Sequence, residues 1–75
     1  MSTQKLRVKS LSGQAKEAIL QYIEEMDLKT DNKLPREEAL AEMLGVSRIT
    51  IRQALNDLAA EGIIFRRPGR GTFVN

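Results

Sequence analysis

Residues 45–55 constrain the fold of this chain more than any other stretch, because they combine a tight turn with an amphipathic helix. Gly45 can adopt the left-handed backbone conformation that ends a helix. Ser47 is a good N-cap for the next helix, since its hydroxyl can accept a hydrogen bond from an unpaired backbone N–H one turn later. At about 100° per residue, one apolar stripe runs along this helix. The stripe consists of Ile51, Ala54, Leu55 and Leu58.

The other sides of this helix, which we expect to run from residue 47 to about 61, are polar and basic. Near its start the outward side chains are Ser47, Arg48, Ile49, Thr50, Arg52 and Gln53. We place the two arginines on one flank and Thr50 on the other. Arginine binds phosphates and guanine edges, glutamine can pair with adenine, and an apolar group can touch the thymine methyl. A short turn before such a helix is how a helix-turn-helix reads a DNA major groove.

Composition excludes most enzyme chemistry for this 75-residue chain, which is long enough for one small domain. The sequence contains no cysteine and no histidine, so the usual nucleophile, general base and soft metal ligands are all missing. No apolar run approaches the roughly 20 residues of a membrane span. We therefore predict a cytoplasmic protein that is not an enzyme and has no catalytic residue, metal site or cofactor.

Charge is distributed unevenly along the chain. Residues 1–13 carry three basic side chains and no acidic one, whereas residues 14–45 carry four basic and eight acidic side chains. Residues 46–75 carry five arginines against two acidic side chains. Arginine is suited to planar, two-point contacts with phosphates and base edges. This pattern suggests that one face meets a polyanion, although an ordinary mixed surface has the same composition.

The first half of the chain predicts two helices. Residues 1–10 read as a flexible basic segment, and a helix over residues 12–27 follows, with Ser12 as its N-cap. Lys33 and Leu34 suit a very short strand. Pro35 fits the opening of a second helix, which Gly45 ends. Its expected buried face consists of Ala39, Leu40, Met43 and Leu44.

The last residues change to the pattern of a β-hairpin. Residues 63–67 are β-branched, aromatic and basic, residues 67–70 match a type II turn, and residues 71–74 form the return strand. We expect Ile64 and Phe73 to pack on the helices. Candidate contacts to a nucleic acid in this hairpin are Arg66, Arg67, Gly69, Arg70, Gly71 and Thr72. The predicted fold is mostly α with a small β-hairpin (α+β): a three-helix winged helix-turn-helix over residues 11–75.

Residues 34–74 resemble the DNA-binding domain of GntR-family bacterial transcription regulators. The strongest matches are Leu34-Pro35, the run from Leu44 to Arg48, Thr50-Ile51-Arg52, Glu61-Gly62 and the closing Gly71-Thr72-Phe73-Val74. With the first helix included, the resemblance covers roughly residues 11–75.

The resemblance implies a regulator that reads operator DNA, most often as a repressor. The third helix would enter the major groove and the hairpin, over residues 63–74, would reach toward the minor groove. Ser47, Arg48, Thr50 and Arg52 would contact DNA by matching position, and Ile49 and Gln53 would tune which operator is read. The family further implies a homodimer on a palindromic operator. Dimerisation and small-molecule binding would belong to a C-terminal effector domain, which we expect to lie outside this chain.

The chain departs from the family where the second helix begins. Family members usually have Ser-Glu-Arg after the proline, whereas this chain has Arg36, Glu37 and Glu38. The missing serine cap costs about 1 kcal/mol of stability unless another group replaces it. The acidic Glu38 replaces an arginine that grips phosphate, and Arg36 is the candidate to take over that contact.

A winged helix that binds protein or structured RNA is the alternative function, since fold does not fix function. The outward Ile49 would suit a protein groove. The arginines of the third helix and the hairpin favour DNA instead.

Overall fold

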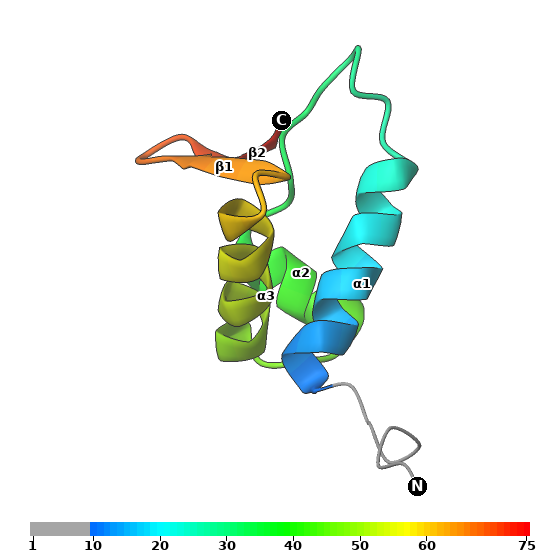
Figure 1. The fold of residues 1–75 in the computed structure, drawn as a ribbon, viewed down its shortest axis with the longest axis vertical. Coiled ribbons are helices and arrows are strands. Elements are labelled where there is room, and N and C mark those ends of the chain that lie inside the picture. The colour runs from blue at the N-terminus through cyan, green and yellow to red at the C-terminus, as the bar shows by residue number, and fades with distance from the viewer. Residues whose placement is uncertain (1–9) are drawn as a thin grey trace, which may run out of the picture.

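The computed structural model describes residues 10–75, so most of the predicted basic segment over residues 1–10 lies outside the described residues. The described part forms three helices and two strands. These are α1 (Leu11–Glu24), α2 (Glu37–Leu44), α3 (Arg48–Ala60), β1 (Ile64–Arg67) and β2 (Gly71–Val74). Figure 1 shows the hairpin lying across the C-terminal end of α3 and projecting away from α1. The predicted fold class, three helices followed by a hairpin, is confirmed.

The start of α1 differs from the prediction. Ser10, and not Ser12, is its N-cap: the Ser10 hydroxyl accepts from the backbone N–H of Gly13 at 3.0 Å. At its other end α1 stops at Glu24 and not at residue 27. Beyond it the Asp27 carboxylate accepts from the backbone N–H of Lys29 and from the Thr30 hydroxyl, which closes a turn. Such local side-chain bonds compete with helix continuation.

The turn between α2 and α3 forms as predicted. Gly45 has a φ of 70° at the end of α2, and the Ser47 hydroxyl caps α3 by accepting from the Thr50 N–H at 3.1 Å. Gly62, with a φ of 78°, follows α3. The backbone N–H groups of Gly62 and Ile63 donate to the carbonyls of Ala59 and Leu58, so α3 ends in a Schellman motif.

The start of α2 shows the effect of the missing serine. Arg36 occupies the N-cap position and its side chain makes no capping hydrogen bond, while Pro35 precedes the cap and is not the first helical residue. The dipole of α2 is still complemented by Glu37 and Glu38 in its first turn. The prediction for its buried face was partly wrong, because Met43 is 54% exposed and Ala41 is buried instead. Ala41 lies beside Leu40 and one turn before Leu44, so the buried face of α2 is centred closer to Ala41 than the prediction placed it.

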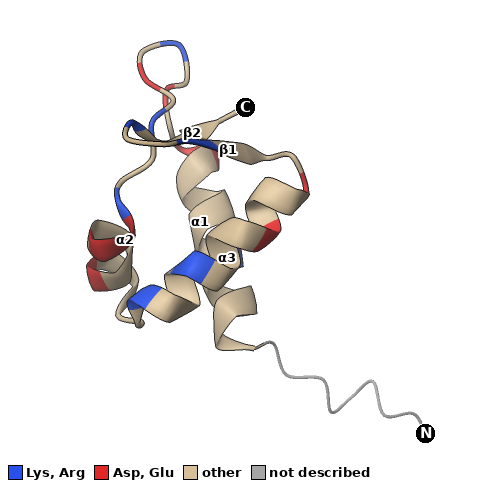
Figure 2. Cartoon of the chain, turned by 90° about the vertical axis from the view of Figure 1, so that its left-hand side faces the viewer, with Lys and Arg blue, Asp and Glu red and all other residues tan. Residues whose placement is uncertain are grey.

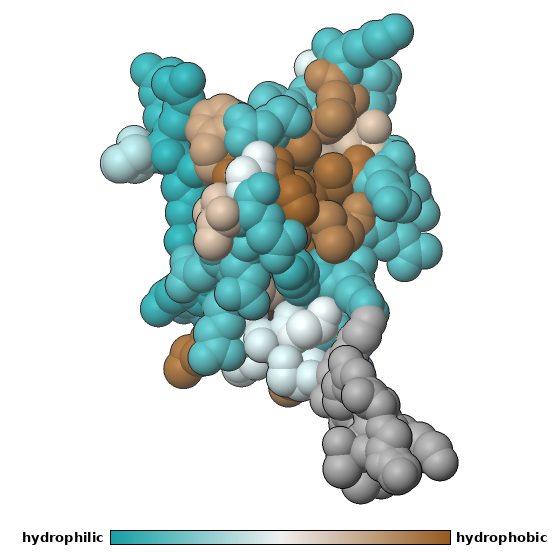
Figure 3. All heavy atoms as spheres, viewed as in Figure 1, coloured by the Kyte–Doolittle hydropathy of each residue, from teal (hydrophilic) through white to brown (hydrophobic). Residues whose placement is uncertain are grey.

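The core lies between the helices and one face of the hairpin. Its largest fully buried side chains are Ile19, Leu40, Ile51, Leu55, Leu58 and Ile64. Each contributes roughly 1.5–3 kcal/mol of transfer free energy. Figure 3 shows apolar side chains also gathering on the surface between α1 and the hairpin, whereas the side formed by α3 and the hairpin is mostly hydrophilic. Over residues 10–75, every helix is too short or too polar to cross a membrane.

The register of the hairpin decides which of its side chains enter the core. Ile64 pairs with Val74, and Phe65 pairs with Phe73, so the two pairs face opposite sides. Ile64 and Val74 are buried against the helices. The prediction that Phe73 packs on the helices was therefore wrong: its ring stacks on that of Phe65, with centroids 5.6 Å apart.

The segment before α2 anchors the hairpin. The N–H of Val74 donates to the carbonyl of Asn32, and the N–H of Leu34 donates to that of Thr72, both at 2.8 Å. Lys33 forms a single antiparallel bridge with Phe73. The very short strand predicted at Lys33 and Leu34 is thus confirmed as one bridge, and it gives a marginal two-stranded hairpin a third partner.

Candidate nucleic-acid interface

The first two turns of α3 present most of their predicted side chains to solvent. Arg48, Ile49, Arg52 and Gln53 are all exposed, and Ile49 is 66% exposed. The opposite side of the helix is fixed, because Ile51 and Leu55 are fully buried. Ile49 therefore shares the solvent-exposed side of α3 with two arginines and a glutamine.

Thr50 does not share this orientation. Its side chain is 8% exposed, and its hydroxyl oxygen lies 2.9 Å from that of Ser47. The prediction of an outward Thr50 was wrong because the residue lies four positions before Ala54 and so extends the buried stripe. Thr50 braces the Ser47 hydroxyl, the group that caps α3.

The arginines of α3 are paired with the acidic start of α2. A terminal nitrogen of Arg52 donates to Glu37 Oε1 at 3.2 Å, and a terminal nitrogen of Arg48 lies 3.7 Å from Glu38 Oε2. These four side chains are between 27% and 72% exposed, so solvent screens both pairs. Such exposed pairs stabilise a fold by less than about 1 kcal/mol.

Arg66 on β1 connects the hairpin to the same cluster. Its Nη1 donates to Asn56 Oδ1 on α3 at 2.6 Å, and its Nη2 lies 4.0 Å from Glu37 Oε2. Sequence reasoning missed both Glu37 and Asn56 as site residues. Their partners are 10 to 29 positions away in the chain, so only the fold brings them together.

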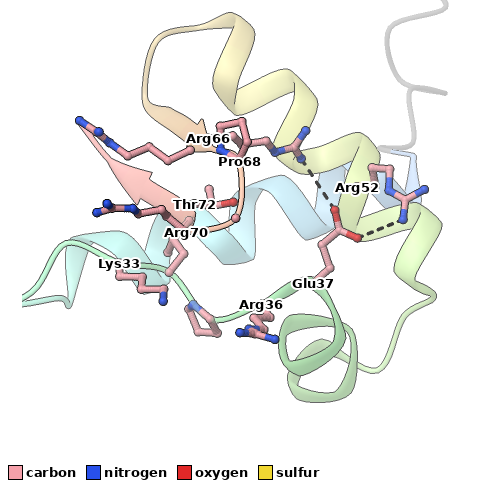
Figure 4. Close-up of a pocket in the computed structure, with 13 residues that line it drawn as sticks. Lys33, Arg36, Glu37, Arg52, Arg66, Pro68, Arg70 and Thr72 are labelled. Atoms are coloured by element: carbon pink, nitrogen blue, oxygen red, sulfur yellow. Dashed lines mark hydrogen bonds and ion pairs between the residues drawn. The ribbon is translucent and has the colours of Figure 1, made fainter.

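An open groove of about 620 Å³ separates the hairpin from the start of α2. Figure 4 shows the basic side chains that surround it, which come from the segment before α2, from α3 and from the hairpin. The cations that line it are Lys33, Arg36, Arg52, Arg66, Arg67 and Arg70. Glu37 is the one carboxylate among the groove's described lining residues. The five arginines among these cations are predicted DNA contacts, whereas the sequence predicts Lys33 only as part of a short strand.

The turn of the hairpin has the predicted geometry. The N–H of Arg70 donates to the carbonyl of Arg67 at 2.9 Å, and Gly69 has a φ of 75°. The guanidinium of Arg67 lies over the Phe65 ring, 5.5 Å from its centroid, while Arg70 is exposed. Both arginines are therefore presented at the end of the hairpin, and Thr72 lies half buried in β2.

Gly71 has a backbone conformation that residues other than glycine rarely adopt. Its φ is 132°, and a Cβ built there would lie 2.8 Å from Cε of Lys33. The aliphatic part of the Lys33 side chain thus packs against bare backbone, which also keeps its ammonium group at the groove.

Figure 2 looks onto the side of the molecule formed by α3 and the hairpin. Basic positions from α3, the segment before α2 and the hairpin are visible together on this side, with acidic positions on α2 between them. Among residues 10–75, no cluster of acidic side chains has an arrangement that could hold a metal ion. What this face offers is a set of guanidinium groups that can make bidentate contacts to phosphates and base edges.

Three helices, a tight turn before an exposed third helix and a hairpin beside it define a winged helix. Residues 11–74 match the family model described as bacterial regulatory proteins of the gntR family, and the chain belongs to this family. The chain is therefore a winged-helix DNA-binding domain of a transcription regulator. Membership of a family of DNA-binding regulators confirms the prediction that this domain is not an enzyme.

Two curated relatives illustrate the similarity. The chain is 45% identical over 62 residues to the HTH-type transcriptional repressor NagR of Bacillus subtilis, which covers 83% of this chain and 26% of that protein. It is 42% identical over 62 residues to the arabinose metabolism transcriptional repressor of Geobacillus stearothermophilus, covering 83% of this chain and 17% of that protein. The chain thus spans about a quarter or less of the length of these relatives.

Solved structures of DNA complexes have the same fold. The N-terminal domain of AraR in complex with a mutant ORR3 superposes with a TM-score of 0.79 at 38% identity, covering 91% of this chain and 97% of that one. The DNA-binding domain of AraR in complex with operator ORX1 gives a TM-score of 0.75 at 35% identity, covering 91% and 82%. These neighbours were both captured on DNA.

Proposed function

We propose that the start of α3 enters the major groove of an operator while the hairpin reaches toward the minor groove, as a wing. The observation that carries this proposal is that Arg52 of α3 and three arginines of the hairpin line one groove, while Arg48, Ile49 and Gln53 are exposed on the same helix. A helix start that presents arginine, isoleucine and glutamine can read base edges. A bare glycine turn flanked by arginines can approach the backbone closely.

The proposed contacts fall into three groups. Arg48 and Arg52 bind phosphates and guanine edges, while Ile49 and Gln53 select the base pairs that they meet. The remaining contacts are to phosphate and sugar, and they are assigned to Arg36, Ser47, Arg66, Arg67, Gly69, Arg70, Gly71 and Thr72. Thr50 acts indirectly, through the Ser47 hydroxyl that it braces.

Arg36 is the proposed substitute for the phosphate-binding arginine that Glu38 replaces. Arg36 is exposed, it lines the groove, and its side chain makes no capping hydrogen bond at the start of α2. Glu38 is instead engaged by Arg48. These observations support a contact from the guanidinium of Arg36 to the DNA backbone on the groove side of α2.

In the intact regulator, two such domains would bind the halves of a palindromic operator, since operator symmetry mirrors the two-fold symmetry of a dimer. A C-terminal effector domain would hold the homodimer together and respond to a small molecule. Repression in the cytoplasm is the proposed outcome. The support is that relatives are named as repressors and are about four to six times as long as the matched region.

The experiment is a titration of this domain with duplex DNA over a range of salt concentrations. The proposal predicts that a plot of the logarithm of the association constant against the logarithm of the salt concentration has a slope of about −3 to −5. Each phosphate that the domain contacts contributes about −0.9 to this slope. A flat salt dependence combined with binding to protein would instead establish the alternative, a winged helix used as a protein-interaction module.

A further inference from the structure

We propose that Glu37 is a positioning residue that holds the base-reading arginine of α3 and an arginine of the wing in one rigid unit. This inference rests on the proposed function and goes further, because it assigns sequence discrimination to a carboxylate that repels DNA. Glu37 opens α2, Arg52 lies in the second turn of α3, and Arg66 lies in β1. One side chain therefore links the three elements that border the groove.

The geometry uses both carboxylate oxygens. Oε1 accepts from Arg52 at 3.2 Å, and Oε2 lies 4.0 Å from Arg66, whose other terminal nitrogen is held by Asn56 at 2.6 Å. Figure 4 shows the two guanidinium groups approaching Glu37 from different sides. The Glu37 side chain is 27% exposed, whereas that of Arg52 is 53% exposed. The acidic group is thus the more enclosed partner, and the arginine keeps an open side for DNA.

A guanidinium has donors enough for two partners at once. Arginine carries five N–H donors in a planar fork, so the bond to Glu37 leaves donors for a base edge or a phosphate. When Glu37 holds one edge of the planar guanidinium, the direction in which the remaining N–H groups point is fixed as well. Recognition of a guanine edge depends on the direction of these N–H groups. Without the carboxylate, Arg52 would still attract DNA by its charge, but its orientation would no longer be set.

This account predicts opposite changes for two kinds of DNA. Glu37→Gln removes a negative charge beside the phosphates, so it should raise affinity for unrelated duplexes by about twofold at low salt. The same change should lower affinity for the preferred duplex by about three- to tenfold, the size of effect expected for side chains in one contact network. Loss of fold would lower both affinities together.

The experiment compares Glu37→Gln with Glu42→Gln in the 75-residue chain. Glu42 is exposed on the same helix, five positions on and so about 140° around it, and its change removes the same charge. The probes are the tightest duplex that the unaltered chain selects from a random pool and a scrambled duplex of the same composition. The inference predicts a reduced ratio of the two affinities for Glu37→Gln and an unchanged ratio for Glu42→Gln.

A second measurement tests the link between the two arginines. Arg52→Ala and Arg66→Ala should be coupled when Glu37 is present, and their effects should become additive when Glu37 is glutamine. Equal affinity ratios for Glu37→Gln and Glu42→Gln would overturn the inference, as would a higher specific affinity for Glu37→Gln, which would mean that the carboxylate competes with DNA for Arg52. If the unaltered chain selects no duplex at all, the proposed function itself fails. That result differs from the two outcomes that would overturn only the role of Glu37.

Discussion

The start of α3 and the wing border the same groove, but the fold holds them in different ways. α3 is capped by Ser47 and anchored by fully buried side chains such as Ile51, so its backbone position is fixed by the core. The wing consists of two four-residue strands whose end carries exposed arginines. Base recognition requires fixed geometry, whereas attraction to phosphate requires only charge. From this difference we propose that α3 provides sequence selectivity and that the wing contributes mainly affinity.

The largest difference between the two regions should come from Arg52→Ala. We expect a loss of about 1–3 kcal/mol for the preferred duplex, because a bidentate base contact is worth that much discrimination. Unrelated DNA should lose only the share due to one charge. Fluorescence anisotropy titrations on both duplexes measure this, and equal losses on the two would refute base reading by Arg52.

The shape of the wing should depend on Gly71 more than on Gly69. Both have positive φ, but the φ of 132° at Gly71 lies farther outside the left-handed region that other residues can adopt than the φ of 75° at Gly69. A Cβ at Gly71 would also lie 2.8 Å from Cε of Lys33, at the movable end of that side chain. We expect Gly71→Ala to lower the free energy of unfolding by about 2 kcal/mol and Gly69→Ala by about 1 kcal/mol. Urea denaturation of the two variants provides the measurement. A Gly69→Ala variant that is the less stable of the pair would contradict the greater backbone strain assigned to position 71.

Arg70→Ala should weaken binding to all duplexes equally, as expected if the wing contacts phosphates and not bases. Its guanidinium is exposed at the turn, so the loss should be about 0.5–1 kcal/mol for any duplex, and the salt slope should become shallower by about 0.9. Lys29→Ala, in the turn after α1 and outside the groove, is the charge-matched control. A sequence-dependent loss for Arg70→Ala would mean that the wing also reads bases.

The smallest effect should come from Glu38→Gln. Glu38 lies 3.7 Å from Arg48, and both side chains are more than half exposed. Removing its charge should raise affinity for any duplex by about twofold at low salt, with no effect at high salt, where such exposed charges are screened. Weaker binding of one particular sequence would instead show that Glu38 accepts a hydrogen bond from DNA, as a carboxylate can from cytosine.

Most of the fold could be predicted because its helix ends and turns are determined by single residues. Gly45, Ser47, Gly62 and Gly69 each determine a helix end or a turn through their own backbone preferences or hydroxyl group. The choice between two nearby serines at the start of α1 was missed, since Ser10 and Ser12 have the same capping chemistry. The actual cap depends on where α1 packs.

The errors within elements have another origin. The exchange of Met43 for Ala41 and of Phe73 for Val74 in the core follows from packing between elements, which periodicity within one element does not fix. The sequence pattern does not decide the side of Thr50, because a threonine at the edge of the apolar stripe fits either a buried or an exposed position. Residue types alone therefore identified the exposed side of α3, but not where this side meets the buried stripe.

The candidate site was predictable where it depends on one helix or one turn. The exposed arginines of α3 and the wing turn follow from local pattern. The Glu37 cluster does not, since it joins residues that are 15 and 29 positions apart. The sequence predicts Arg52 and Arg66 as contacts, but their connection through Glu37 follows only from the way that α2, α3 and β1 pack around one groove.

The most direct test of this account is selection from a pool of random duplexes by the chain, with sequencing of the bound fraction. The account predicts enrichment of one short half-site or its palindrome, and loss of that enrichment when Arg48 and Arg52 are both replaced by alanine. Salt-sensitive binding without enrichment of any sequence would contradict it. The domain would then be an electrostatic clamp, and Ile49 and Gln53 would not be readers of sequence.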